Sequence, residues 1–218
     1  MRVDVKFCGM TRAEDVREAV RLGASYVGVI FAGGPRELTS ERAESILQGT
    51  PPAVRRVGVF ANQTSAEIGD IARRLRLTTV QLHSARDERS IADVRSHFDG
   101  EVWSVVRVEG TVLPSGLPAL FAAADAVLLD SKVAGTLGGT GISVAWSGIA
   151  PALAAARAGV GRLVLAGGLR PDNVAEAIDA LHPDVVDVSS GIEASPGIKD
   201  HSRMRSFMQA VHGAQVPR

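Results

Sequence analysis

Residues 3–30 read VDVKFCGMTRAEDVREAVRLGASYVGVI, and this stretch contains a strand, a helix and a second strand. Apolar β-branched residues dominate both of its ends. Between them, one helix face is indicated by apolar residues at the i, i+3, i+4 spacing, namely Val16, Ala19 and Val20. Glu14 follows Thr11 at the spacing of a capping box, so we expect Thr11 to cap this helix.

The same unit recurs along the chain. Predicted strands begin near Val3, Tyr26, Val54, Thr78, Glu101, Asp125, Arg162 and Asp184. Their starts lie roughly 20 to 40 residues apart, which suits one strand, one helix and two short connections. Apolar residues at helical spacing fill the intervals, and Thr64 with Glu67 forms a second capping-box pattern.

Eight strand–helix units predict an α/β fold, a (β/α)8 or TIM barrel, formed by residues 1–218 as a single domain. The alternative is an open, doubly wound sheet. That fold usually has fewer units and carries a glycine-rich phosphate loop after its first strand, which the segment KFCGMT (6–11) does not resemble. No linker or shift in composition divides the chain.

The composition excludes several classes of protein. The 218 residues include 24 Lys and Arg and 24 Asp and Glu, so we expect neither a nucleic acid nor a membrane surface as a partner. Cys8 is the single cysteine of the sequence, which excludes an intramolecular disulfide and a multi-cysteine metal site. Asp4 and Lys6 stand where a signal peptide needs its apolar stretch, so we expect a cytoplasmic location.

The active site of such a barrel lies at the carboxyl ends of its strands. Polar residues expected there are Cys8, Arg36, His83, Arg107, Asp130, Ser189 and Ser190. Because side chains alternate along a strand, Lys6 and Cys8 should share the inward face of the first strand, and Asp130 should end that of the sixth. The ammonium of Lys6 favours a reactive thiolate at Cys8, although a buried apolar role is the alternative for any cysteine.

Glycine-rich segments follow the predicted sixth, seventh and eighth strands: GGTG (138–141), AGG (166–168) and SSG (189–191). Glycine permits close backbone approach, and clustered backbone N–H groups bind anions. The loops after strands seven and eight commonly hold phosphate in this fold. The three segments together predict a phosphate site on one side of the barrel mouth.

Eight segments carry a likeness to a known family: KFCGMT, GVIFAGGPR, VGVF, VQLHS, LLDS, GGTG, LAGGLRPDNV and VDVSSGIEASPGIKD. In their order and spacing, the chain resembles the phosphoribosylanthranilate isomerases of tryptophan biosynthesis along essentially its whole length. The resemblance implies an isomerase that needs no metal, nucleotide or redox cofactor. It leaves open whether the protein is a monomer or a homodimer.

The resemblance also implies roles for single residues. The family's general base, the cysteine of K-x-C-G, falls on Cys8, and its general acid, the aspartate that closes L-L-D-S, falls on Asp130. The arginine of its S-P-R segment, which pairs with the anthranilate carboxylate, falls on Arg36. Its phosphate-binding positions fall on Gly139, Gly141, Gly167, Gly168, Ser190 and Gly191.

The implied reaction is an Amadori rearrangement of N-(5-phosphoribosyl)anthranilate to 1-(2-carboxyphenylamino)-1-deoxyribulose 5-phosphate. An acid must protonate the ring oxygen and a base must remove the C2′ proton. Asp130 suits the first role if the mouth of the barrel is partly desolvated, since burial favours a protonated carboxyl. We expect His83 to be a hydrogen-bonded structural residue, and Asp187 and Arg107 to contact substrate hydroxyls or support the site.

Two other functions compete with this one. A related isomerase of histidine biosynthesis performs the same chemistry, but such enzymes generally use two aspartates, and Cys8 argues against that. The other is a phosphosugar-binding barrel without catalytic activity.

Three positions depart from the family pattern. Gly34 replaces the serine of S-P-R, and Ser84 replaces the glycine of L-H-G, where a positive φ would strain it. Ala145 replaces an aspartate before Trp146 and so removes an expected helix N-cap. None of the three removes a proposed catalytic group, so they bear on efficiency and stability.

Overall fold

The computed structural model describes residues 2–84, 87–109, 112–132, 142–157 and 161–214. In this part of the chain, parallel strands close into a barrel in the order β1 to β8. They are β1 (Asp4–Phe7), β2 (Tyr26–Ile30), β3 (Arg55–Phe60), β4 (Thr79–Leu82), β5 (Glu101–Glu109), β6 (Ala126–Lys132), β7 (Arg162–Ala166) and β8 (Val185–Val188). Each strand starts at the expected residue or one residue after it, which confirms the predicted barrel.

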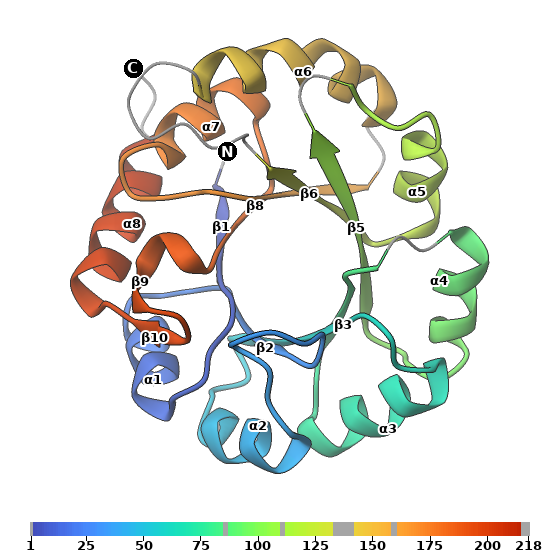
Figure 1. The fold of residues 1–218 in the computed structure, drawn as a ribbon, viewed down its shortest axis with the longest axis vertical. Helices are drawn as coiled ribbons and strands as arrows, with labels where there is room; N and C mark the ends of the chain where they lie inside the picture. Colours follow the sequence, from blue (N-terminus) through green and yellow to red (C-terminus); the bar gives the residue numbers. More distant parts are fainter. Residues whose placement is uncertain (1, 85–86, 110–111, 133–141, 158–160, 215–218) are drawn as a thin grey trace.

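Helices alternate with the strands and form the outer ring in Figure 1. They are α1 (Ala13–Arg21), α2 (Ser40–Leu47), α3 (Ser65–Leu75), α4 (Glu88–Arg95), α5 (Leu117–Ala123), α6 (Ile142–Arg157), α7 (Val174–Leu181) and α8 (His201–Ala214). A short 3-10 turn, η1 (Ser190–Ile192), and an antiparallel hairpin of β9 (Glu193–Ser195) and β10 (Ile198–Lys199) lie between β8 and α8. The barrel closes because β1 pairs with β2 on one side and with β8 on the other.

The two predicted capping boxes differ in outcome. At α3 the pattern is confirmed: the Glu67 backbone N–H donates to Thr64 Oγ1 at 3.3 Å, and the Thr64 N–H donates to Glu67 Oε2 at 2.7 Å. At α1 the prediction is wrong, because Arg12 is the N-cap residue and makes no side-chain capping bond. The Thr11 hydroxyl donates instead to the Gly197 carbonyl in the turn between β9 and β10.

The prediction for Ala145 is wrong as well. Helix α6 begins at Ile142, so position 145 lies within its first turn and is not the N-cap. The absence of an aspartate at position 145 therefore does not remove the N-cap of α6.

Alternation along the strands divides the core into two layers. The outer layer, between strands and helices, includes Val3, Val5 and Phe7 of the first strand segment, as predicted. The inner layer fills the barrel itself and consists of Tyr26, Val57, Trp103, Val105, Ala126, Leu128, Val164, Ala166 and Val185. The barrel is therefore a packed core rather than a channel.

Charged groups close the amino-terminal end of this inner layer. Glu101 accepts hydrogen bonds from Arg55 at 2.9 Å and from Arg162 at 3.4 Å. Both guanidinium groups lie over the ring of Tyr26, 5.2 and 5.9 Å from its centre. Ion pairs and cation–π contacts thus cover this end, which leaves the carboxyl ends of the strands for a site.

Candidate active site

A cavity of about 360 Å³ opens at the carboxyl ends of the strands. It brings together residues from β1, β2, β3, β4, β6, β7 and β8 or the loops that follow them. Of the predicted site residues it is lined by Cys8, Arg36, His83, Asp130, Gly167, Gly168, Asp187, Ser189 and Ser190. Side chains up to 182 positions apart in the sequence therefore face one space, as a closed barrel requires.

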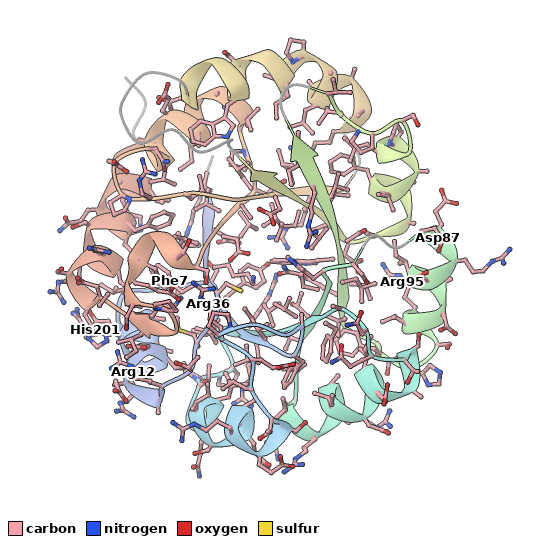
Figure 2. All side chains as sticks on the ribbon, viewed as in Figure 1. Phe7, Arg12, Arg36, Asp87, Arg95 and His201 are labelled. Atoms are coloured by element: carbon pink, nitrogen blue, oxygen red, sulfur yellow. The ribbon has the colours of Figure 1, made fainter. Side chains whose placement is uncertain are left out.

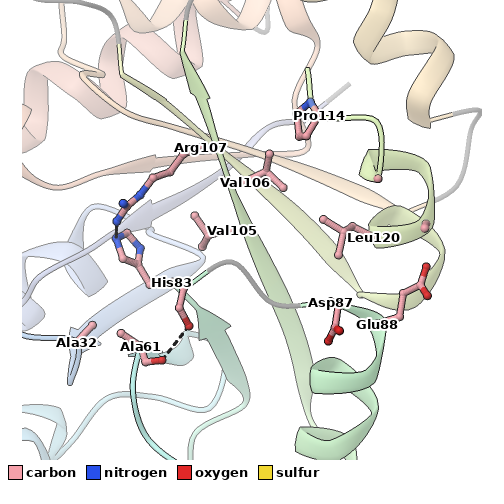
Figure 3. Close-up of a pocket in the computed structure, with 13 residues that line it drawn as sticks. Ala32, Ala61, His83, Asp87, Glu88, Val105, Val106, Arg107, Pro114 and Leu120 are labelled. Atoms are coloured by element: carbon pink, nitrogen blue, oxygen red, sulfur yellow. Dashed lines mark hydrogen bonds between the residues drawn. The ribbon is translucent and has the colours of Figure 1, made fainter. Parts of the chain in front are cut away.

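A larger and mainly apolar cavity of about 980 Å³ lies beside it, between the loops after β4 and β5 (Figure 3). Ala32 and His83 line both cavities, so the two are neighbours. Arg107 and Leu120 face the larger one. The structure thus places Arg107 at the boundary of the predicted site.

Lys6 forms a buried polar cluster below Cys8. Its side chain is fully buried, and its ammonium donates to Gln81 Oε1 at 2.9 Å and to Asp187 Oδ2 at 2.8 Å. These partners come from β4 and β8, so the cluster spans the interior of the barrel. Burial lowers the pKa of Lys6, but the charges of Asp187 and Cys8 and the hydrogen bond to Asp187 outweigh burial, so the net shift is upward.

Cys8 lies on the inward face and lines the cavity, as predicted, and is 6% exposed. Burial raises the pKa of its thiol, and the charge of Lys6 opposes this without cancelling it. The charge of Lys6 thus favours the thiolate, as expected, but the net shift of the Cys8 pKa is upward. Desolvation of the charged sulfur outweighs the effect of the nearby ammonium.

His83 pairs with Arg107, whose Nη2 donates to the ring Nε2 at 3.3 Å (Figure 3). Burial lowers the pKa of His83, and the charge of Arg107 lowers it further. Since Nε2 accepts this bond, the neutral ring carries its proton on Nδ1. Nδ1 is buried and has no hydrogen-bond partner among the described residues, which leaves it one donor for a ligand.

The loops after β7 and β8 meet closely beside the cavity. Gly167 and Gly168 have φ values of +89° and +63°, a region that favours glycine, and both line the cavity. A Cβ on Gly191 would lie 1.9 Å from the Leu169 carbonyl oxygen. Gly191 therefore permits the contact between the two loops rather than lining the cavity. Gly139 and Gly141 lie outside the described residues.

Arg36 extends from the loop after β2 and lies inside the ring of helices in Figure 2. Its Nε and Nη2 donate to the two carboxylate oxygens of Glu193, at 2.7 and 2.6 Å. Lys199 donates to the same carboxylate at 2.8 Å. A carboxylate of the protein itself therefore occupies one side of the predicted carboxylate-binding arginine.

At two of the positions that depart from the family pattern, the backbone conformation shows the effect of the substitution. Ser84 is not among the described residues with a positive φ, so the expected strain is absent, and its hydroxyl donates to the Ala61 carbonyl at 2.8 Å. Gly34 has a φ of +90°, so this position favours glycine over serine.

Sequence reasoning missed Gln81, Glu193 and Lys199. Gln81 could have been found, because it precedes His83 by two positions and so shares the inward face of its strand. Glu193 reaches Arg36 across 157 positions, and no local pattern signals such a contact.

Comparisons with known proteins agree with this geometry. The family model described as N-(5'phosphoribosyl)anthranilate (PRA) isomerase matches residues 5–210. A protein named N-(5'-phosphoribosyl)anthranilate isomerase from Pseudomonas fluorescens (strain Pf0-1) is 39% identical over 207 residues, covering 94% of this chain and 97% of the relative.

Solved structures agree as well. The crystal structure of phosphoribosyl anthranilate isomerase from Thermotoga maritima superposes with a TM-score of 0.83 at 37% identity, covering 97% of this chain and 99% of that one. A phosphoribosyl anthranilate isomerase in complex with reduced 1-(o-carboxyphenylamino)-1-deoxyribulose 5-phosphate superposes with a TM-score of 0.81 at 34% identity, with the same coverage. The chain thus belongs to the N-(5'-phosphoribosyl)anthranilate isomerase family.

Proposed function

We propose that this protein converts N-(5-phosphoribosyl)anthranilate to 1-(2-carboxyphenylamino)-1-deoxyribulose 5-phosphate. One observation carries the proposal: a thiol, a carboxyl group, a guanidinium and two glycine loops line a single cavity at the carboxyl ends of the strands. The family to which the chain belongs is named for this reaction.

Asp130 is the proposed acid. It lies on β6 two residues after the buried Leu128, and both line the cavity. In the first step its carboxyl proton passes to the furanose ring oxygen. The C1′–O bond breaks, and the nitrogen lone pair forms the C1′–N double bond of an open-chain Schiff base.

Cys8 is the proposed base. Its thiolate takes the C2′ proton, and the electron pair of the C–H bond forms the C1′–C2′ double bond while the C=N electrons return to nitrogen. The resulting enolamine tautomerises to the ketone. Lys6 favours the thiolate against the effect of burial, so its ammonium supports this step without touching the substrate.

The two ends of the substrate have separate anchors. Backbone N–H groups of the loops at Gly167, Gly168 and Ser190 suit the phosphate, and Arg36 suits the anthranilate carboxylate. Fixing both ends places the sugar between Cys8 and Asp130. Within the described part of the chain, His83 Nδ1 and Asp187 Oδ1 have no hydrogen-bond partner, so both are candidates for contacts to the sugar hydroxyls.

The proposal is tested by adding purified protein to freshly generated phosphoribosylanthranilate and following the loss of its fluorescence. Turnover with the histidine-pathway aminoaldose alone would favour the related isomerase. Binding of phosphosugar without turnover of either compound would favour a binding protein.

No helix among the described residues is both long and apolar enough to cross a membrane. A cytoplasmic location, a single domain over residues 1–218 and the choice between monomer and homodimer stay predictions.

The pKa of Cys8 has a direct test, because alkylation requires the thiolate and the chain has one cysteine. Since burial raises this pKa, iodoacetamide should react with an apparent pKa above that of free cysteine, about 8.5. The rate is measured from about pH 7 to about pH 10 beside a cysteine amide standard. An apparent pKa below the standard would show that the thiolate is stabilised in the free protein.

Arg36→Lys should raise KM about tenfold, or about 1.4 kcal/mol, with little change in kcat. An ammonium cannot present two parallel N–H groups to a carboxylate. Arg21→Lys is the control, because Arg21 forms a similar pair with Glu18 on α1. Steady-state kinetics measure both constants. An unchanged KM in Arg36→Lys would show that the substrate carboxylate binds elsewhere.

A further inference from the structure

Glu193 holds the guanidinium of Arg36 from one side. Its carboxylate receives Nε at 2.7 Å and Nη2 at 2.6 Å, and its side chain is 5% exposed. A guanidinium has five N–H groups, and this side-on pair uses two of them. Among the described residues, the Nη1 atom of Arg36 has no hydrogen-bond partner. The Nη1–Nη2 end is therefore the part of Arg36 that remains for a ligand in the cavity.

The stem of Arg36 is held as well. A Cβ on Gly9 would lie 2.6 Å from Arg36 Cδ, so the arginine packs against the backbone of the loop after β1. Gly9 has a φ of +68°, which also favours glycine there. With its stem against Gly9 and its Nε side on Glu193, Arg36 has little freedom to rotate.

The element that carries Glu193 is itself anchored. The Lys199 backbone N–H donates to Asp15 Oδ2 at 3.3 Å, and its carbonyl accepts from Arg12 Nη2 at 3.2 Å, which ties β10 to the start of α1. Arg203 of α8 donates to the Glu193 carbonyl at 2.5 Å. The hairpin of β9 and β10 is thus fixed at both strands and presents the Glu193 carboxylate at a set place.

The positive charge of Lys199 offsets the negative charge that Glu193 places beside Arg36. Its buried ammonium lies 2.8 Å from Glu193 Oε1 and donates to the Ser189 carbonyl at 3.1 Å. Burial would raise the pKa of Glu193, but its bonds to Arg36 and Lys199 lower it overall. One carboxylate between two cations leaves a net positive charge beside the cavity. A Glu193–Arg36 pair alone would be neutral and would attract an anion weakly.

We propose that Glu193, supported by Lys199, is a positioning residue that aims the Nη1–Nη2 end of Arg36 at the carboxylate of the aromatic ring of the substrate. This inference rests on the proposed function, in which Arg36 binds that carboxylate. It makes the hairpin a determinant of specificity for aminosugars with an acidic aryl group.

The test compares two ligands. One is reduced 1-(o-carboxyphenylamino)-1-deoxyribulose 5-phosphate, called the reduced product below, which carries the carboxylate. The other is the same compound without the carboxylate. Glu193→Gln should raise the Kd of the carboxylated ligand and KM about tenfold and leave kcat within about threefold. The Kd of the ligand without the carboxylate should not change, because its phosphate is bound elsewhere. A purely structural role would weaken both ligands together.

Glu18→Gln is the matched control. Glu18 forms the same side-on pair, with Nε and Nη2 of Arg21 at 2.7 and 2.8 Å, on the outer helix α1. This variant should change neither Kd. If Glu193→Gln does not fold, Glu193→Asp keeps the charge, withdraws the carboxylate from Arg36 and allows the same comparison.

Two outcomes overturn the inference. If Glu193→Gln binds the carboxylated ligand as tightly as the unaltered protein, or more tightly, Glu193 competes with the substrate rather than aiming Arg36. If Arg36→Lys also leaves the difference between the two ligands unchanged, the proposed role of Arg36 fails too. If Arg36→Lys reduces the difference in Kd between the two ligands but Glu193→Gln does not, only the role of Glu193 is overturned.

Discussion

Replacing Cys8 with alanine is expected to lower kcat by about 10²–10⁴-fold, the range for a positioned general base. The alanine removes the thiol that would take the C2′ proton, and Cys8 is the single cysteine of the sequence. The phosphate loops and Arg36 belong to other strands. Binding of the reduced product should therefore survive.

Two measurements separate loss of the base from loss of the site. Calorimetry with the reduced product should give a Kd within about threefold of the unaltered protein, while single-turnover kinetics show the slow step. Cys8→Ser, a closer mimic in shape with a much less acidic group, should be nearly as inactive. A Cys8→Ala enzyme that retains more than about a tenth of kcat would assign the base to another residue.

The barrel could be predicted because its determinants are local. Each strand is a short apolar β-branched run and each helix a spacing of three and four residues, so every element is visible within its own segment. The face of each strand follows from alternation, which placed Cys8 and Asp130 in the cavity. The cap expected at Thr11 does not form, because the Thr11 hydroxyl donates to Gly197 in a distant turn, a contact that no local pattern signals.

The candidate site could be predicted only in part, for the same reason. The sequence shows which residue types stand at the strand ends, but it does not show how burial and neighbouring charges together set their pKa values. Lys6 precedes Cys8 by two positions, which suggested a stabilised thiolate, yet burial of the sulfur has the larger effect on its pKa. Burial depends on how eight strands close, and no single segment contains that information.

The second large effect is expected for Asp130→Asn, which should lose at least about 10²-fold in kcat. Asparagine keeps the shape of the side chain and its hydrogen-bonding capacity, but it has no carboxyl proton to give to the ring oxygen. Asp130 pairs in register with Arg107 of β5 and Ala166 of β7, so it lies at the mouth, next to the strand that leads into the phosphate loop. The variant should bind the reduced product almost as tightly as the unaltered protein.

Asp125→Asn controls for the substitution itself. Asp125 stands at the opposite end of the same strand, where its carboxylate accepts from the Val102 N–H and from Arg95, both at 2.8 Å. That variant should keep kcat. If Asp130→Asn keeps kcat within about threefold, another group is the acid. If its affinity for the reduced product falls in parallel with kcat, Asp130 holds the substrate instead of protonating it, because a proton donor is needed in the transition state and not in the bound product.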